Sequence, residues 1–133
     1  MTISITIKAF AVWIGILLLA IANGVFREVF LIPTLGEISG LILSGVLLSI
    51  FILFVVYFAL PWIGKTVAVN YVLIGISWLC MTLFFEFTFG YAQGKSWQQL
   101  FDAYLFKDGN IWPIVILITA LAPYLSAKVR GWT

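Results

Sequence analysis

Four long apolar runs fill almost the whole of this 133-residue sequence. A helix needs roughly 20 apolar residues to span the hydrocarbon core of a bilayer. Four runs of that length, joined by short connections, leave no room for a soluble domain. Charged residues make up 9% of the chain, whereas a soluble domain of this size would carry about 25%. Because so little polar surface remains to face water, the sequence predicts an all-α integral membrane protein.

The spacing of prolines, glycines and apolar residues predicts a single domain, residues 1–133, built as a bundle of four transmembrane helices. The stretch 96–106 has apolar residues at helical spacing, and Ser96 with Gln99 forms a capping box. It predicts a short amphipathic helix in the membrane interface. This helix either only connects the third and fourth spans or serves as a lid or docking surface. The spans are expected at about 5–32, where Pro33 ends the first, and at 37–60, 68–89 and 111–127.

Lysine and arginine set the expected orientation. Residues Lys8, Lys65, Lys128 and Arg130 fall on one side of the predicted membrane. The other side carries Lys95, Lys107 and, at its edge, Arg27. Since cytoplasmic loops are enriched in these residues, the bias predicts a multi-pass protein of the bacterial inner membrane with both termini in the cytoplasm.

Polar residues of several spans are expected at one depth, in the outer leaflet. Arg27 lies 19 residues after Lys8, which is about 28 Å along a helix and close to the hydrocarbon thickness. Glu28 is therefore also near the outer boundary, and Glu37 begins the second span at the same level. Glu86 lies roughly one turn inside the outer end of the third span.

Two helical stripes carry these polar groups. An ionisable side chain within hydrocarbon normally faces the bundle or a wet cavity, so both stripes are expected to face inward. Arg27 is then predicted to pair with Glu86, and Glu28 or Glu37 is the competing partner. The stripes are Trp13, Ile16, Ala20, Asn23 and Arg27 on the first span, and Tyr71, Gly75, Trp78, Thr82 and Glu86 on the third.

Three acids beside one arginine leave a formal excess of two negative charges, which favours a proton or cation. We therefore expect a small membrane protein, as an oligomer, that binds or transports a small solute or cation through this polar cluster. One alternative is that the cluster is structural and fixes the helix register. Another is a non-catalytic accessory subunit of a larger membrane complex. The candidate ligand- or ion-binding residues are Asn23, Arg27, Glu28, Glu37 and Glu86.

Several function classes are not expected. The chain has no histidine and one cysteine, Cys80, so the usual His/Cys metal sites and a His-ligated haem are excluded. No nucleophile–base pair or phosphate loop is present, so neither an enzyme nor a cofactor is predicted. The net charge of +2 is too small and scattered for nucleic acid. The expected partners are the lipid bilayer and either further copies of the chain or a larger membrane complex.

Small residues and tryptophans add two expectations. Small residues on the second span, Gly36, Gly40 and Ser44 with Gly45 and Ser49, permit close helix packing, either in a dimer or within one monomer. For the monomer, Ala11 and Gly15 would form the facing groove. Near the predicted membrane boundaries, Trp62, Trp97, Trp112 and Trp132 are typical of interface anchors, whereas Trp13 and Trp78 lie deeper and could line a cavity.

Five stretches, which together span most of the chain, resemble a family of small four-helix bacterial inner-membrane proteins that has no assigned activity. The resemblance implies four spanning helices and a charged stretch around Arg27 that is shared across the family. It implies no activity. The stretches are ANGVFRE at 22–28, LPWIG at 60–64, FEFTFG at 85–90, WQQLFDAY at 97–104 and WPIVILITALAP at 112–123.

Overall fold

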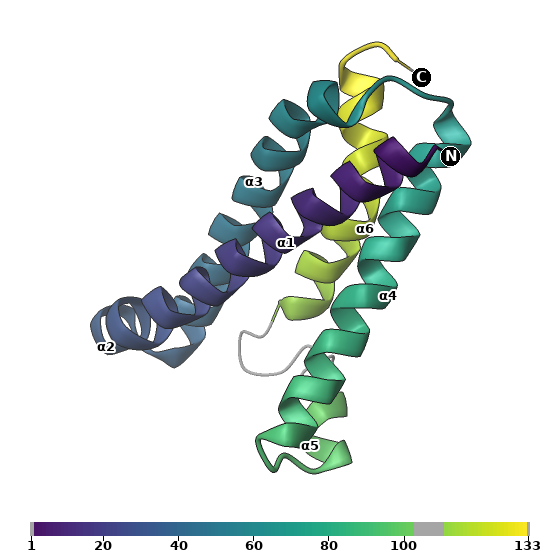
Figure 1. Ribbon diagram of the computed structural model, residues 1–133. Helices are drawn as coiled ribbons and strands as arrows, with labels where there is room; N and C mark the ends of the chain where they lie inside the picture. The colour runs from purple at the N-terminus through teal and green to yellow at the C-terminus, as the bar shows by residue number, and fades with distance from the viewer. Residues whose placement is uncertain (1, 103–110, 133) are drawn as a thin grey trace.

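The computed structural model describes residues 2–102 and 111–132, and all regular structure among them is helical. Four long helices form a bundle, which confirms the predicted all-α fold (Figure 1). The first is extended by a π-helical segment, η1, and by one further α-helical turn. In chain order the elements are α1 (Ile3–Phe26), η1 (Arg27–Leu31), α2 (Ile32–Leu35), α3 (Glu37–Ile63), α4 (Ala68–Ala92), α5 (Trp97–Asp102) and α6 (Trp112–Val129).

The four long helices are each long and apolar enough to cross a bilayer. Their outward faces carry large apolar side chains, for example Phe58 on α3 and Phe84 on α4, which are 69% and 73% exposed. The chain is therefore a multi-pass membrane protein whose exposed apolar surface suits contact with lipid. The two ends of the chain lie at the same end of the bundle, as an even number of spans requires (Figure 1).

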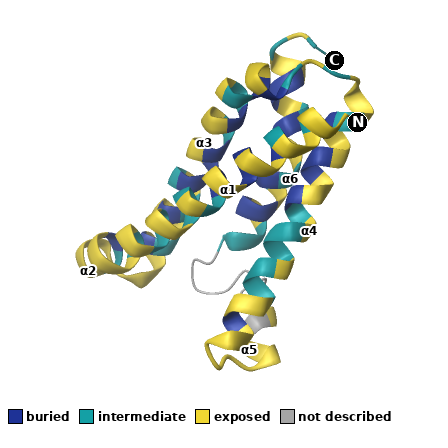
Figure 2. Cartoon of the chain, viewed as in Figure 1, coloured by how far each residue is buried: buried dark blue, intermediate teal, exposed yellow. Residues whose placement is uncertain are grey.

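The helices pack most tightly at the end of the bundle that carries the termini. Helix α6 packs against both α3 and α4, and α1 packs against α3 and, less extensively, against α4. There the indole of Trp78 donates a hydrogen bond to the carbonyl of Ala9 at 3.0 Å. Toward the opposite end, α1 and α3 diverge from α4, so buried residues become fewer (Figure 2). The residues that close the tight end include Val56, Leu60, Tyr71, Ala122 and Ala127.

The first span does not end at Pro33, so that expected boundary is wrong. The helix continues to Leu35 and stops at Gly36, whose φ of 91° is a left-handed conformation that suits glycine. The cause is the π-helical turn, in which the N–H of Ile32 bonds the carbonyl of Arg27, five residues back. Pro33 then falls in the first turn of α2, where its missing N–H costs little.

Helix α3 likewise continues past its predicted end at residue 60, through Pro61 to Ile63. Proline has no N–H, so the carbonyl of Tyr57, four residues earlier, loses its helical partner. Arg130 replaces that partner, because its Nε and Nη2 donate to the Tyr57 carbonyl at 2.9 and 2.6 Å. A neighbouring helix can satisfy a carbonyl freed by proline in this way, which is why the helix is not interrupted.

Both hydrogen bonds of the predicted capping box are present at the start of α5. The N–H of Gln99 donates to Ser96 Oγ at 3.2 Å, and the N–H of Ser96 donates to Gln99 Oε1 at 2.9 Å. The rings of Trp97 and Phe101 contact Phe87 on α4, with centroid distances of 6.2 and 5.4 Å. The rest of the predicted interfacial helix, residues 103–106, lies outside the described residues.

Small residues on α3 make close contacts within one chain. A Cβ on Gly40 would lie 2.9 Å from Ile32 Cγ1, and one on Gly45 would clash with the side chain of Ile111. The structure thus shows the monomer alternative at these two positions. The expected facing groove was wrong, because Ala11 and Gly15 are exposed and α2 and the start of α6 supply the contacts instead.

Candidate functional site

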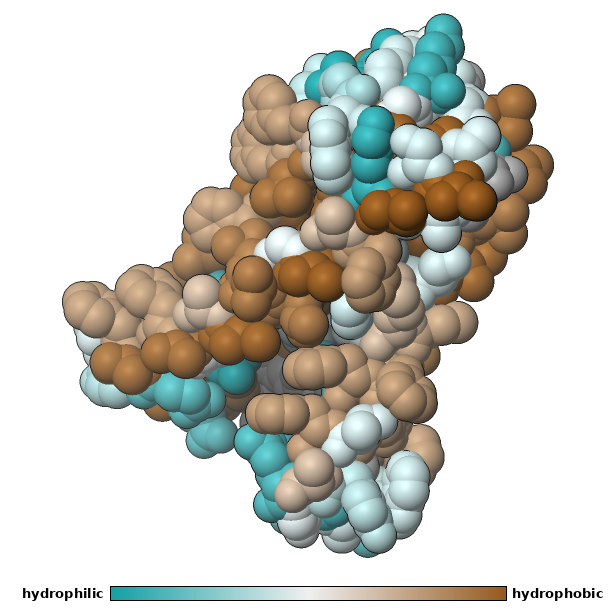
Figure 3. All heavy atoms as spheres, viewed as in Figure 1, coloured by the Kyte–Doolittle hydropathy of each residue, from teal (hydrophilic) through white to brown (hydrophobic). Residues whose placement is uncertain are grey.

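The bundle contains a partly open cavity of about 510 Å³ between α1, α3, α4 and α6. On the face shown in Figure 3, the molecule is hollowed between the arm formed by α1 and α3 and the arm formed by α4 and α5. Sites for small molecules commonly have volumes of about 300–1,000 Å³, so the cavity is large enough for one ligand. Both predicted stripes face inward, since all ten of their residues are buried or half-buried.

Apolar side chains form the deep part of the cavity, here named the floor. Trp13 lies there, and its indole donates a hydrogen bond to Thr82 Oγ1 at 3.0 Å, which joins α1 to α4. The expectation that these tryptophans line a cavity is confirmed for both, because Trp13 lines this cavity and Trp78 lines a second pocket between α1 and α4. The floor comprises Trp13, Ile16, Leu48, Ile52, Val115 and Ile116.

Polar side chains gather at the other end of the cavity, here named the rim. The rim comprises Asn23, Arg27, Glu86, Gln93, Lys95 and Gln99. Three of these, Asn23, Arg27 and Glu86, are among the five predicted site residues. The rim residues come from α1, η1, α4, the connection after α4 and α5, so the fold brings together side chains more than 70 positions apart in the sequence.

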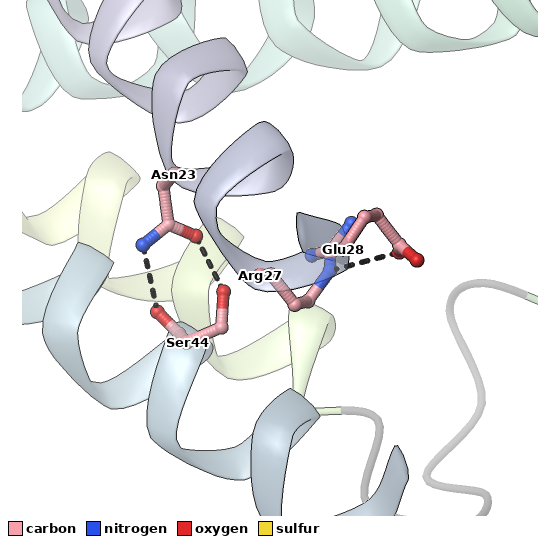
Figure 4. Close-up of polar contacts among 4 residues, drawn as sticks. All are labelled: Asn23, Arg27, Glu28 and Ser44. Atoms are coloured by element: carbon pink, nitrogen blue, oxygen red, sulfur yellow. Dashed lines mark hydrogen bonds and ion pairs between the residues drawn. The ribbon is translucent and has the colours of Figure 1, made fainter. Parts of the chain in front are cut away.

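Asn23 is held in place by two hydrogen bonds to Ser44 of α3 (Figure 4). Its Oδ1 accepts from Ser44 Oγ at 2.5 Å, and its Nδ2 donates to the Ser44 carbonyl at 3.3 Å. Ser44 is only 1% exposed and Asn23 is half-buried, so this polar pair is partly shielded from solvent and from lipid. The pair fixes the distance between α1 and α3 directly below the rim.

Arg27 pairs with its neighbour Glu28, and the predicted pair between Arg27 and Glu86 is not formed. The Nε of Arg27 lies 3.3 Å from Glu28 Oε1 (Figure 4). The sequence predicts similar depths for Arg27 and Glu86, but α1 and α4 diverge at this level. Glu28 was the competing partner in that prediction, and the divergence leaves it as the nearer carboxylate.

Glu86 instead accepts a hydrogen bond on its Oε2 from the indole of Trp112, at 2.8 Å. Trp112 was expected to be an interface anchor, but it is half-buried and lines the cavity at the start of α6. Depth was the available signal, because Trp112 begins the fourth span and Glu86 lies within the last two turns of the third, at the same end of the bundle. Tryptophans near a membrane boundary are usually interface anchors, so the contact of Trp112 with Glu86 was not predicted.

The other two predicted site residues lie outside the cavity lining. Glu28 is 63% exposed, and Glu37 is exposed in the first turn of α3, where the helix dipole stabilises an acid. Among the described residues, the charged side chains that line the cavity are therefore Arg27, Lys95 and Glu86. The expected excess of acids is absent from this described lining, because Glu28 and Glu37 lie outside it. Within the described part of the chain, no group of three or more Cys, Asp or Glu side chains could hold a metal ion.

Together these features define a multi-pass membrane protein with a cavity that has an apolar floor and a charged rim. Comparison with models of known protein families, with characterised proteins and with solved structures found no match. The resemblance to small four-helix bacterial membrane proteins therefore stays a prediction.

Proposed function

We propose that this protein binds a small solute in the cavity between α1, α3, α4 and α6. The observation that carries the proposal is the division of one cavity of about 510 Å³ into an apolar floor and a charged rim. Binding sites are commonly apolar with a few convergent polar groups that fix the ligand's orientation. Two tryptophan N–H groups, of Trp13 and Trp112, bond acceptors on α4 and hold the helices around this space.

The packing below the floor supports binding rather than open passage. Toward the termini the bundle is closed by side chains with no exposed surface, among them Val56, Leu60 and Tyr71. A channel would need a second opening through this packed core. Among the described residues, the charged side chains of the lining are two basic and one acidic, and Lys95 and the terminal amino groups of Arg27 support a neutral or anionic solute over a cation.

The proposed setting is the bacterial inner membrane with both termini in the cytoplasm. Its support is the position of Lys8, Lys65, Lys128 and Arg130 near the end that carries the termini, where the positive-inside rule expects them. The rim would then face the outer leaflet.

Filling the cavity tests the proposal. Ala20 lines the cavity and is half-buried, whereas Ala22, two positions along α1, is exposed outside it. We expect native mass spectrometry of the protein purified in mild detergent to detect a bound small molecule in the wild type and in Ala22→Trp. The Ala20→Trp variant should lose it.

A bound molecule that persists in Ala20→Trp, or none in the wild type, would overturn the proposal. If the wild type carries no small molecule but copurifies with another protein at fixed stoichiometry, the accessory-subunit alternative is favoured.

A further inference from the structure

We propose that the ligand of this cavity is an amphiphile with an anionic headgroup, a phosphate or carboxylate, bound between Arg27 and Lys95. Its apolar tail would lie against the floor. This inference rests on the proposed binding function and adds the chemical class of the ligand.

Two positively charged side chains of the rim have hydrogen-bond donors available for a ligand. Glu86 is engaged, because its Oε2 accepts the Trp112 indole N–H at 2.8 Å. Arg27 uses its Nε for Glu28, at 3.3 Å. Within residues 2–102 and 111–132, neither terminal amino group of Arg27 nor the ammonium group of Lys95 has a hydrogen-bond acceptor. The rim thus offers two cations with free donors.

Arginine and lysine at one rim suit an oxyanion. A guanidinium presents parallel N–H donors that match two oxygens of a phosphate or carboxylate, and an ammonium adds a compact charge. The side chain of Arg27 is 30% exposed and lies at the edge of a largely apolar environment. Glu28 contacts only the Nε of this guanidinium, so an anionic headgroup would pair with the terminal amino groups and further offset the charge.

The mouth of the cavity supports an apolar tail. Ile21 on α1 and Phe89 on α4 both line the cavity, yet they are 50% and 52% exposed. They come from α1 and α4, the two helices that diverge toward this end of the bundle (Figure 1). An acyl chain could pass between them from the bilayer to the floor without entering water. A small hydrophilic anion would gain nothing from this mouth.

The test follows quenching of Trp13, on the floor, by brominated lipids in detergent micelles. The signal is the difference in fluorescence between the wild type and Trp13→Phe. We expect phosphatidylglycerol with brominated acyl chains to quench at a concentration about tenfold lower than brominated phosphatidylcholine, as loss of one charged hydrogen bond would give. The Arg27→Gln/Lys95→Gln variant should abolish this preference.

The matched control is Lys65→Gln/Lys128→Gln, which removes the same charge from two exposed residues at the other end of the bundle. It should keep the preference for phosphatidylglycerol. Equal quenching by both lipids, unchanged in the rim variant, would overturn the anionic headgroup while leaving cavity binding intact. Absence of quenching of Trp13 by either lipid would overturn the proposed function as well.

A competition arm separates the sources of the anion. Dodecyl phosphate should displace brominated phosphatidylglycerol, and inorganic phosphate at the same concentration should not. Equal displacement by inorganic phosphate would show that the rim binds a free anion, which would overturn the amphiphile.

Discussion

The indole of Trp112 donates a hydrogen bond to Glu86 Oε2 at 2.8 Å and so joins α6 to α4 at the rim. In this arrangement one carboxylate oxygen of Glu86 bonds α6, and Arg27 bonds Glu28 instead. Hydrogen bonds to a charged group are the stronger kind, and this one is partly shielded from solvent.

Replacing Trp112 tests that bond. Trp112→Phe keeps the ring but removes the donor, so we expect the free energy of unfolding to fall by about 1.5–3 kcal/mol. Circular dichroism during unfolding in mixed micelles would measure it. The control is Trp62→Phe, at a tryptophan that is 54% exposed. Equal losses in the two variants would contradict a specific role for the Trp112 donor.

The contact between Asn23 and Ser44 gives a second prediction. Ser44→Ala removes the donor to Asn23 Oδ1 and leaves a half-buried amide oxygen without it, so we expect a loss of about 1–3 kcal/mol. Ser39→Ala, at an exposed serine of the same helix, should change stability by less than about 0.5 kcal/mol. The same micelle titration measures both. A neutral Ser44→Ala would mean that the pair does not hold α1 to α3.

Two glycines should respond to alanine with opposite signs. A Cβ on Gly75 would clash with the carbonyl oxygen of Ala120, so Gly75→Ala forces α4 away from α6 and should cost about 1–3 kcal/mol. A Cβ on Gly15 would meet nothing within 4 Å, so Gly15→Ala should stabilise α1 by about 0.5–1 kcal/mol. Thermal unfolding in detergent compares them. A stabilising Gly75→Ala would refute the close contact between α4 and α6.

Arg130 and Pro61 should be coupled through the carbonyl of Tyr57. Arg130→Gln leaves that carbonyl without its bidentate donor and should lower stability by about 1–3 kcal/mol. Adding Pro61→Ala restores a helical N–H four residues after Tyr57, so the double variant should recover most of the loss. Lys128→Gln serves as the charge control. Additive effects in this double-mutant cycle would show that the arginine does not replace the proline's missing donor.

The fold followed from the sequence because the bilayer imposes strong requirements on it. Length and hydropathy alone located the four spans, and the inward stripes followed from the cost of charges in hydrocarbon. The helix ends at Pro33 and Pro61 were misplaced because local rules treat proline as a helix breaker. A π-helical turn lets the first helix continue past Pro33, and Arg130 supplies the hydrogen bonds that Pro61 removes from the second. Neither feature can be predicted from the residues next to the proline.

The candidate site was predicted only in part. Asn23, Arg27 and Glu86 reach the cavity, since their faces are set by helical spacing. The wrong pairing of Arg27 arose because depth along a span says nothing of how far two helices separate laterally. Lys95 was assigned to a connection, and a connection has no periodicity to reveal which way a side chain points.

The bond between Arg130 and Tyr57 also has a consequence for biosynthesis. Its partners are 73 residues apart, so the second span enters the membrane well before its missing donor is made. At a synthesis rate of roughly 5–20 residues per second, the Tyr57 carbonyl waits about 4–15 s for Arg130. During that interval the Tyr57 carbonyl of α3 has no hydrogen-bond donor, because Pro61 lacks an N–H. The last turn of α3 gains its missing hydrogen bond only when α6 has inserted beside it.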